Sequence, residues 1–263
     1  MTRTALVTGA SSGIGRATAS ALAARGYRVL GTSRDPDGQK VEGVEFLPLD
    51  LAETASIEEL AAAAGDIDVL VNNAGESQSG PFEELPADAL SRLFQVNVLG
   101  PVRLSQLLLP GMRERGYGRV VMVGSMLASF PLAYRSSYVA TKAALKGFAS
   151  GARHEYSPFG VWITTVEPGS INTGISERRT KYLAPGSPHR RDFETMLAAL
   201  DRNERAGIGP GRVAEVIVKA IETPRPKQRY AVGSNAPMAF TLRRIVPQSV
   251  AEKLTHRRHG LTR

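Results

Sequence analysis

Short runs rich in valine, isoleucine and leucine alternate along the chain with longer stretches of helical periodicity. Seven runs predict buried strands, at residues 4–9, 27–33, 44–49, 67–75, 118–125, 161–169 and 229–233. Helical patterns separate them, at residues 14–26, 57–64, about 86–115, about 134–157 and 212–222. Continuously apolar strands joined by helices are typical of a parallel sheet covered on both faces. We therefore predict one Rossmann-like, doubly wound α/β domain over 1–263, with ligands at the carboxyl ends of its strands.

Two segments and one dipeptide interrupt this rhythm. Residues 174–210 carry proline, glycine and charged pairs between a strand and a helix, and an insertion of that length is typical of a substrate lid. Residues 236–263 form a basic C-terminal extension, in which Pro247 divides two short amphipathic helices. We expect this extension to pack on the lid or on a second subunit and not to lie on a membrane. Gly100-Pro101 indicates a break in the helical region before Arg115.

Composition and charge exclude several kinds of site. No cysteine occurs in the 263 residues, which rules out disulfides and thiolate chemistry. No stretch approaches the roughly 18 consecutive apolar residues of a transmembrane helix, and no signal peptide is evident, so we expect a cytoplasmic protein. Residues 225–263 hold nine basic side chains and one acid, which accounts for the net charge of +8. No nucleic-acid motif accompanies them, and His256 and His259 have only Glu252 nearby, so neither nucleic acid nor metal is expected.

The sequence TGASSGIG, at residues 8–15, lies between the first predicted strand and the first predicted helix. Gly9 permits a tight turn, Gly13 lets the backbone approach a ligand, and Gly15 allows close packing of helix on strand. The free N–H groups at the start of a helix, together with its dipole, favour a pyrophosphate. The spacing G-x-x-x-G-x-G differs from the common dinucleotide fingerprint, so this turn alone is weak evidence.

A second candidate pair is Tyr138 and Lys142, four residues apart in a run of small residues. In a helix the two side chains lie on the same face. Of the seven tyrosines, only this one is followed by a lysine at that offset. The ordinary interpretation of such a pair is a partly buried aromatic ring beside a lysine that extends to solvent.

Taken together, these motifs resemble the short-chain dehydrogenase/reductase family. The resemblance rests on the glycine turn, on NNAG at 72–75, on Asn97, on Ser125 at a strand end, on the Tyr138/Lys142 pair, and on EPGSINT at 167–173. It spans about residues 4 to 233, in the family's order and spacing. The long C-terminal extension is more similar to the steroid- and retinoid-type branch than to the shorter acyl-carrier-protein reductases.

The resemblance implies hydride transfer between a nicotinamide and a carbonyl or carbinol carbon. Tyr138 would be the acid/base, and the ammonium group of Lys142 would favour its ionised form and hold the nicotinamide ribose. Ser125 would bond the substrate oxygen; nearby Ser129 is the alternative, but Ser125 directly ends the apolar strand. Asn97 would anchor a water that links Lys142 to solvent, a role compatible with a helix kink at this residue.

The resemblance also implies a cofactor site, and its sequence favours NADP over NAD. An NAD site usually has an acid at the end of the second strand, where this chain has Ser33 followed by Arg34, which can fork onto a 2′-phosphate. Asp35 is one residue further on, next to Pro36. Asp50 would bind the adenine edge. The residues expected at the cofactor are Gly9, Ser11, Ser12, Gly13, Ile14, Gly15, Ser33, Arg34, Asp50, Leu51, Asn73, Ala74, Gly75, Tyr138, Lys142, Pro168, Gly169, Ile171 and Thr173.

For the substrate we expect a small lipophilic ketone, aldehyde or alcohol. The predicted pocket residues are Met126, Leu127, Leu132, Tyr134 and part of the apolar lid set Tyr182, Leu183, Phe193, Met196, Leu197 and Leu200. Two alternatives stay open. The lid's basic residues (Arg178, Arg179, Lys181, Arg190 and Arg191) suit a carrier-protein or CoA-linked 3-oxoacyl substrate, and a non-catalytic nucleotide-binding regulator is the second. We expect a homodimer or homotetramer.

Overall fold

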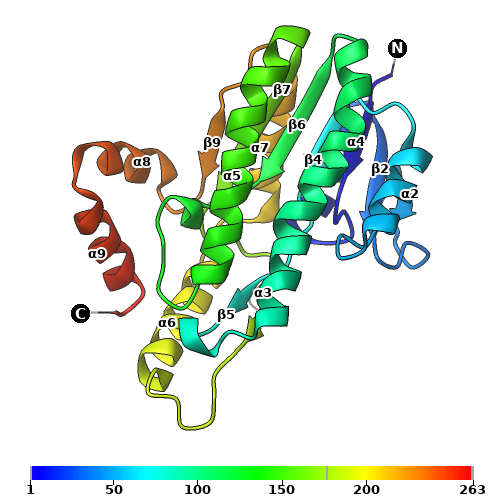
Figure 1. Cartoon of the computed structure of the whole chain (residues 1–263). Helices are drawn as coiled ribbons and strands as arrows, with labels where there is room; N and C mark the ends of the chain where they lie inside the picture. The colour runs from blue at the N-terminus through cyan, green and yellow to red at the C-terminus, as the bar shows by residue number, and fades with distance from the viewer. Residues whose placement is uncertain (1, 176, 262–263) are drawn as a thin grey trace.

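A sheet of seven parallel strands forms the centre of the computed structural model, which describes residues 2–175 and 177–261 (Figure 1). The strand order is β3-β2-β1-β4-β6-β7-β9. The strands are β1 (Thr4–Val7), β2 (Arg28–Ser33), β3 (Val44–Pro48), β4 (Val69–Asn72), β6 (Gly118–Val123), β7 (Val161–Pro168) and β9 (Arg229–Val232). The predicted fold class is confirmed.

Helices cover both faces of this sheet and bury its apolar side chains. They are α1 (Gly13–Ala23), α2 (Thr54–Ala64), α3 (Ala87–Phe94), α4 (Gly100–Glu114), α5 (Ser136–Tyr156), α6 (Arg190–Arg205), α7 (Pro210–Glu222), α8 (Ala236–Ile245) and α9 (Gln248–Arg258). One core cluster joins the strands to α2, α4 and α5 through Leu60, Leu104 and Leu145. The other joins them to α1 and α7 through Leu22 and Ile217. Alternate strand residues supply the two clusters, as the continuously apolar runs require.

The strand order reverses at β1, which pairs with β2 on one side and with β4 on the other. The connections that follow β1 and β4 leave in opposite directions and create a crevice at the carboxyl ends of these two strands. Doubly wound folds bind ligands in such a crevice. The glycine turn follows β1 directly, and Asn73 and Gly75 follow β4. The topology therefore brings the predicted site residues to one edge of the sheet.

The long helical region is divided at the predicted junction, because α4 begins at Gly100. The irregular turn is a π-helical turn, η2 (Gln95–Leu99), whereas Gly100 already has helical dihedrals and opens α4. The glycine is needed for packing, because a Cβ at this position would come within 2.9 Å of the Leu51 carbonyl oxygen. The Gly-Pro dipeptide thus marks a close contact and a helix start, and the preceding turn supplies the irregularity.

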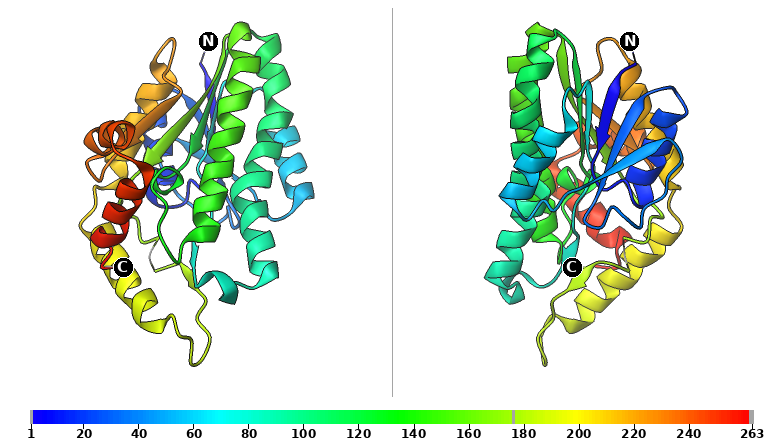
Figure 2. Two further views of the ribbon diagram at one scale, coloured as in Figure 1. Left: turned by 60° about the vertical axis from the view of Figure 1, so that its left-hand side comes forward. Right: turned by 90° about the vertical axis from the view of Figure 1, so that its right-hand side faces the viewer.

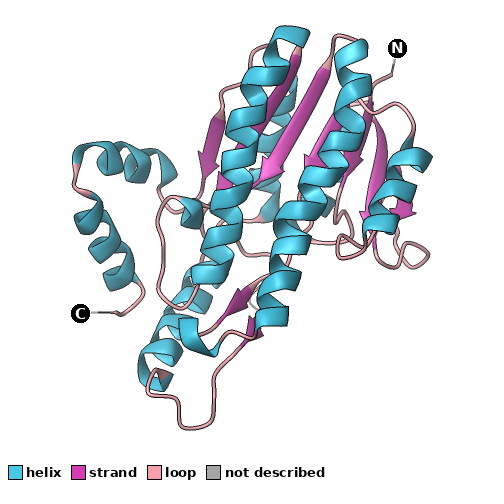
Figure 3. Cartoon of the chain, viewed as in Figure 1, coloured by secondary structure: helices cyan, strands magenta, loops and turns pink. Residues whose placement is uncertain are grey.

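The lid takes part in two elements that the sequence pattern did not predict. One is helix α6. The other is a two-stranded parallel ribbon, in which β8 (Thr180–Lys181) of the lid pairs with β5 (Gln78–Ser79); it lies beyond the end of the main sheet (Figure 3). The ribbon ties the lid to the loop after β4. Inside the lid, Arg179 is buried and forms ion pairs with Asp201 and Glu204 of α6, at 2.7 and 2.5 Å.

The C-terminal extension consists of α8 and α9, separated at Pro247 as predicted, and it lies beside the lid helix (Figure 2). Phe240 of α8 packs edge-on against Phe130, with ring centroids 5.1 Å apart. Leu261 packs into the cluster that holds Phe193 and Leu200 of α6. None of the helices in the described part of the chain has both the length and the apolar character needed to cross a membrane.

Candidate active site

The glycine turn forms one wall of a cleft at the sheet edge. Gly9 and Gly13 have φ values of +66° and +54°, which favour glycine, and a Cβ at Gly15 would overlap the Gly9 carbonyl. Ser12 precedes α1 in an extended conformation, and its side chain does not cap the helix. The first N–H groups of a helix have no partner within it. The turn therefore presents backbone donors and a positive helix end to the cleft.

The far wall of the cleft contains the residues that follow β2 and β3. Ser33, Arg34 and Asp50 all line it, whereas Asp35 does not. Arg34 is exposed and forms no ion pair or hydrogen bond with another described residue. A carboxylate oxygen of Asp50 accepts a hydrogen bond from the Ala52 N–H, at 2.9 Å. Arg34 is thus the free cation at this end.

Tyr138 and Lys142 lie on one face of α5, as their spacing predicts, and both are buried. The Lys142 Nζ is 5.7 Å from the centre of the Tyr138 ring and donates to the Val123 carbonyl at 3.0 Å. Ser125 comes two residues after the same carbonyl, and its Oγ accepts from the Leu127 N–H at 3.2 Å. Ser129 instead bonds Lys146 and Glu167. The structure thus brings Ser125, and not Ser129, to the wall that Tyr138 shares.

Asn97 lies in the π-helical turn η2 and is buried. Its Oδ1 accepts from the Glu76 N–H at 2.8 Å, and its Nδ2 donates to the Glu76 carbonyl at 3.0 Å and to Thr141 Oγ1 at 3.3 Å. These bonds fasten the loop after β4 to α5. Gly75 lies between Asn97 and Lys142, since a Cβ there would be 2.9 Å from Asn97 Oδ1 and 3.8 Å from Lys142 Nζ.

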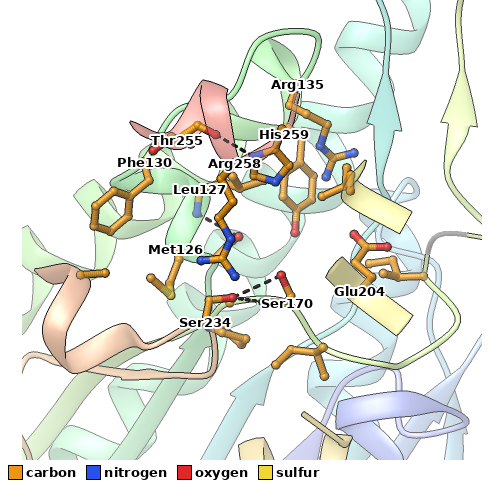
Figure 4. A pocket seen from close by; sticks show the side chains of 18 of the residues that line it. Met126, Leu127, Phe130, Arg135, Ser170, Glu204, Ser234, Thr255, Arg258 and His259 are labelled. Carbon is orange, nitrogen blue, oxygen red and sulfur yellow. Dashed lines mark hydrogen bonds between the residues drawn. The ribbon is translucent and has the colours of Figure 1, made fainter. Parts of the chain in front are cut away.

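Two cavities meet at Tyr138. The first is the cleft just described, of about 360 Å³, which Lys142 also lines. The second, of about 280 Å³, is lined by Ser125 and by a mixture of apolar and polar side chains (Figure 4). Tyr138 lines both of them, together with Ile14, Thr173 and Ile175.

Most residues expected at the cofactor line the first cavity, and four do not. Pro168, Gly169 and Ile171 line the second cavity instead, because the turn after β7 faces that side. Gly15 lines neither, since it packs against Gly9 and Asn73. Arg178, which the sequence analysis assigned to the basic residues of the lid, lines the first cavity and donates to Ser12 Oγ at 3.4 Å.

The second cavity differs from the predicted pocket in which residues line it. Met126 and Leu127 line it as expected, but Leu132 and Tyr134 pack against α6. Of the six apolar lid residues, only Leu200 reaches it. Helices α8 and α9 and the residue after α9 supply a further part of the wall, through Ala239, Leu242, Arg243, Ala251, Leu254, Thr255, Arg258 and His259. The amphipathic pattern predicted these helices but did not show which surface they cover.

Arg135 is a buried cation that the sequence also missed. Its guanidinium lies over the Tyr138 ring, 4.2 Å from the centroid, and donates to Ser77 Oγ, the Gln78 carbonyl and Ser79 Oγ at 2.8–3.1 Å. Burial, with a contribution from nearby Arg179, lowers the pKa of Arg135 to about 10. The sequence feature that could have pointed to Arg135 is an arginine at the start of a helix of small residues.

Comparisons with known proteins agree with this fold and site. The family described as "short chain dehydrogenase" matches residues 3–183. A 3-ketodihydrosphingosine reductase of Bacteroides thetaiotaomicron is 30% identical, with 89% of each chain covered. Human 17-beta-hydroxysteroid dehydrogenase type 1 is 33% identical, over 92% of this chain and 78% of the relative.

Solved structures show the same likeness. A short-chain dehydrogenase from Streptomyces avermitilis superposes with a TM-score of 0.82 at 36% identity, covering 97% of this chain and 96% of the other. An alcohol dehydrogenase from Thermococcus sibiricus, complexed with 5-hydroxy-NADP, has a TM-score of 0.71 at 27% identity, covering 89% and 97%.

The fold and the two adjoining cavities define a dinucleotide-binding oxidoreductase. The chain belongs to the short-chain dehydrogenase family and is an enzyme of that type. The family uses a nicotinamide cofactor, and the uncapped helix start, the close approach at Gly15 and the free Arg34 fit such a group.

Proposed function

We propose that the protein is an NADP(H)-dependent oxidoreductase that interconverts a ketone or aldehyde and an alcohol on a lipophilic substrate. The observation that carries this proposal is the position of Tyr138 at the junction of the two cavities. A group that exchanges a proton with the substrate oxygen must be within reach of the substrate while hydride is exchanged on the cofactor side. When bound, the nicotinamide supplies or accepts that hydride.

In this proposal each residue of the chain has a distinct task. Tyr138 donates its hydroxyl proton to the substrate oxygen during reduction and takes it back during oxidation. Ser125 donates a hydrogen bond to the same oxygen, and the positive charge of Lys142 favours the ionised phenol. Asn97 holds the loop after β4 against α5 and anchors a water on the proton route from Lys142.

The preference for NADP rests on Arg34. A guanidinium without a partner in the described structure, beside a neutral Ser33, provides charge-assisted hydrogen bonds for a 2′-phosphate. An acid at that position would instead bond the 2′-hydroxyl of NAD. The NADP-type ligand of the Thermococcus sibiricus relative supports the same choice.

The lipophilic substrate rests on the second cavity. Met126, Leu127, Phe130 and Leu242 are among its lining residues, and apolar walls with a few polar groups are typical of small-molecule sites. The names of the sphingosine and steroid relatives support this class. The cytoplasmic location and the homo-oligomeric state expected from the sequence stay predictions.

The test is NADPH oxidation with a panel of dodecan-2-one, a ketosteroid, all-trans-retinal and acetoacetyl-CoA. We expect turnover of the apolar carbonyl compounds and a loss of about 10²–10⁴-fold in Tyr138→Phe, with NADPH affinity kept within a few fold. Tyr156→Phe, at the other end of the same helix, is the control. A Tyr138→Phe variant that keeps more than about a tenth of the rate contradicts this role. Turnover of the thioester alone favours the 3-oxoacyl alternative, and NADPH binding without any turnover favours the regulator.

A further inference from the structure

The charges around the second cavity do not cancel. Arg179, Asp201, Glu204 and Arg135 form a buried group of two cations and two anions, which is neutral as a whole. Glu204 is the only carboxylate among the described residues that line the cavity. Arg243 and Arg258 also line it, from α8 and α9. The cavity therefore has two cations that no acid of the described structure balances.

Arg258 is the cation directed most clearly into the cavity. Its side chain extends from α9 toward Ser170 and Ser234, whose hydroxyl oxygens are 3.2 Å apart (Figure 4). The described structure contains no ion pair or hydrogen bond of its guanidinium. Arg243, by comparison, lies over the Phe130 ring at 5.7 Å. Glu252, the nearest acid in the sequence, bonds Gln248 at 2.7 Å.

We propose that the substrate is an apolar ketone or alcohol with an anionic head group, a carboxylate or a phosphate, which pairs with Arg258. This inference rests on the proposed function and narrows its substrate class. A guanidinium binds either oxyanion through two parallel hydrogen bonds. The apolar wall of Met126, Leu127 and Leu242 then holds the hydrocarbon part, and Ser125 and Tyr138 hold the reacting oxygen.

The 3-oxoacyl alternative placed the substrate's anion at five basic residues of the lid, and three of these have other contacts in the structure. Arg179 is paired inside the lid, Arg190 pairs with Glu194 at 3.2 Å, and Arg178 faces the cofactor cleft. The free cations of the substrate cavity come from the C-terminal extension instead.

A basic residue in the last turn of α9 also has a purely structural explanation, because it complements the helix dipole. Arg257 provides the control for that explanation. It lies in the same turn and is exposed like Arg258, but it does not line the cavity. An effect specific to Arg258 therefore reports on the cavity and not on the helix end.

The first experiment measures binding of three unreactive twelve-carbon probes, dodecanoate, dodecyl phosphate and dodecanamide, to the full-length protein by calorimetry. We expect at least one anionic probe to bind about 10- to 100-fold more tightly than the neutral amide. Arg258→Gln removes most of that preference, Arg258→Lys keeps part of it, and Arg257→Gln keeps all of it. The better of the two anions identifies the head group.

The second experiment compares reduction of oxododecanoates, with the keto group at successive positions, and of their methyl esters. We expect a higher kcat/KM for the acids, and an acid-to-ester ratio that falls in Arg258→Gln and not in Arg257→Gln. Equal affinity for the amide and both anions, no binding of any probe, or a preference that survives Arg258→Gln overturns the inference. If no ketone is reduced at all, the proposed function fails, while the head-group preference is still decided by the binding data.

Discussion

Two arginines of the predicted site, Arg34 and Arg135, differ in their surroundings and therefore in their tasks. Arg34 is exposed at the end of the cofactor cleft and has no ion-pair partner in the described structure. Arg135 is buried, and its Nη1 donates to the loop at 77–79. An unpaired exposed cation is available to a ligand, whereas a buried cation held by hydrogen bonds positions its neighbours.

The first residue-scale prediction concerns Arg34→Ala. Removing charge-assisted hydrogen bonds costs about 1.5–3 kcal/mol, so NADPH affinity should fall roughly 10- to 150-fold while NADH affinity hardly changes. Isothermal titration calorimetry with both cofactors measures this. Arg28→Ala is the control. Arg28 is the first residue of β2, the strand that ends just before Arg34, and it pairs with Glu45 outside the cleft. An equal loss for both cofactors would show a structural role.

The second concerns Arg135→Met. The change leaves Ser77, Gln78 and Ser79 without their buried donor, so we expect a loss of about 1–3 kcal/mol in the free energy of unfolding. The contact over the Tyr138 ring is also lost, and this contact helps to hold the ring at the junction of the two cavities. We therefore expect kcat to fall as well, which denaturant titration alone would not reveal. An unchanged kcat with lower stability would limit Arg135 to a structural role.

At the scale of elements, the main sheet and its helices could be predicted because each buries a continuous or periodic apolar set. The β5–β8 ribbon could not, since two-residue strands have no periodicity and their partner is about a hundred residues away. The Gly100-Pro101 dipeptide predicted the helix junction, but the contact of Gly100 with Leu51 that requires a glycine there is not visible in any local pattern. Likewise, Arg135 acquires its partners only when the loop 56–58 residues earlier reaches it.

Helix α9 is attached to the body partly through two histidines. The Ala133 N–H donates to His256 Nε2 at 3.2 Å. His259 is buried, and its Nδ1 lies 2.8 Å from the Thr255 carbonyl oxygen. Burial, and then the nearby Arg258, His256 and Arg135, lower the pKa of His259 below its usual value of 6.5.

This arrangement predicts a pH-dependent attachment of α9. Because the pKa of His259 is lower in the docked helix than in the undocked one, the undocked state binds more protons in acid. The contribution of His259 to the docking of α9 is complete above about pH 6.5 and is lost as the pH falls below that value. Hydrogen-exchange protection factors for 248–258 should drop as the pH falls from about 6.5 to 5.5, and less so in His259→Gln. His154→Gln, an exposed histidine, is the control, and an equal drop in all three proteins would contradict the prediction.

At the scale of the whole molecule, the chain divides its ligand site between two parts. The first 178 residues supply every described residue of the cofactor cleft, whereas α8 and α9 close the adjoining cavity. The sequence motifs identify the cleft because they directly follow strands whose order the topology fixes. The closing helices carry an amphipathic pattern that is equally compatible with the lid, a second subunit or a membrane. Only the tertiary structure selects the lid side.

The division predicts the effect of deleting residues 247–263, which removes α9 and leaves α8 in place. We expect NADPH affinity to stay within about twofold, while KM for the best ketone rises roughly 10- to 150-fold, the equivalent of one apolar side-chain contact of about 1.5–3 kcal/mol. Calorimetry and steady-state kinetics measure the two quantities, with Lys253→Gln as an exposed control on the same helix. Parallel losses in both would indicate general unfolding. A different result would assign α9 to a membrane surface: the full chain co-sediments with phosphatidylglycerol vesicles, salt weakens this binding, and the deletion abolishes it. The basic residues of α9 and its exposed Val250 and Leu254 would then face the lipid.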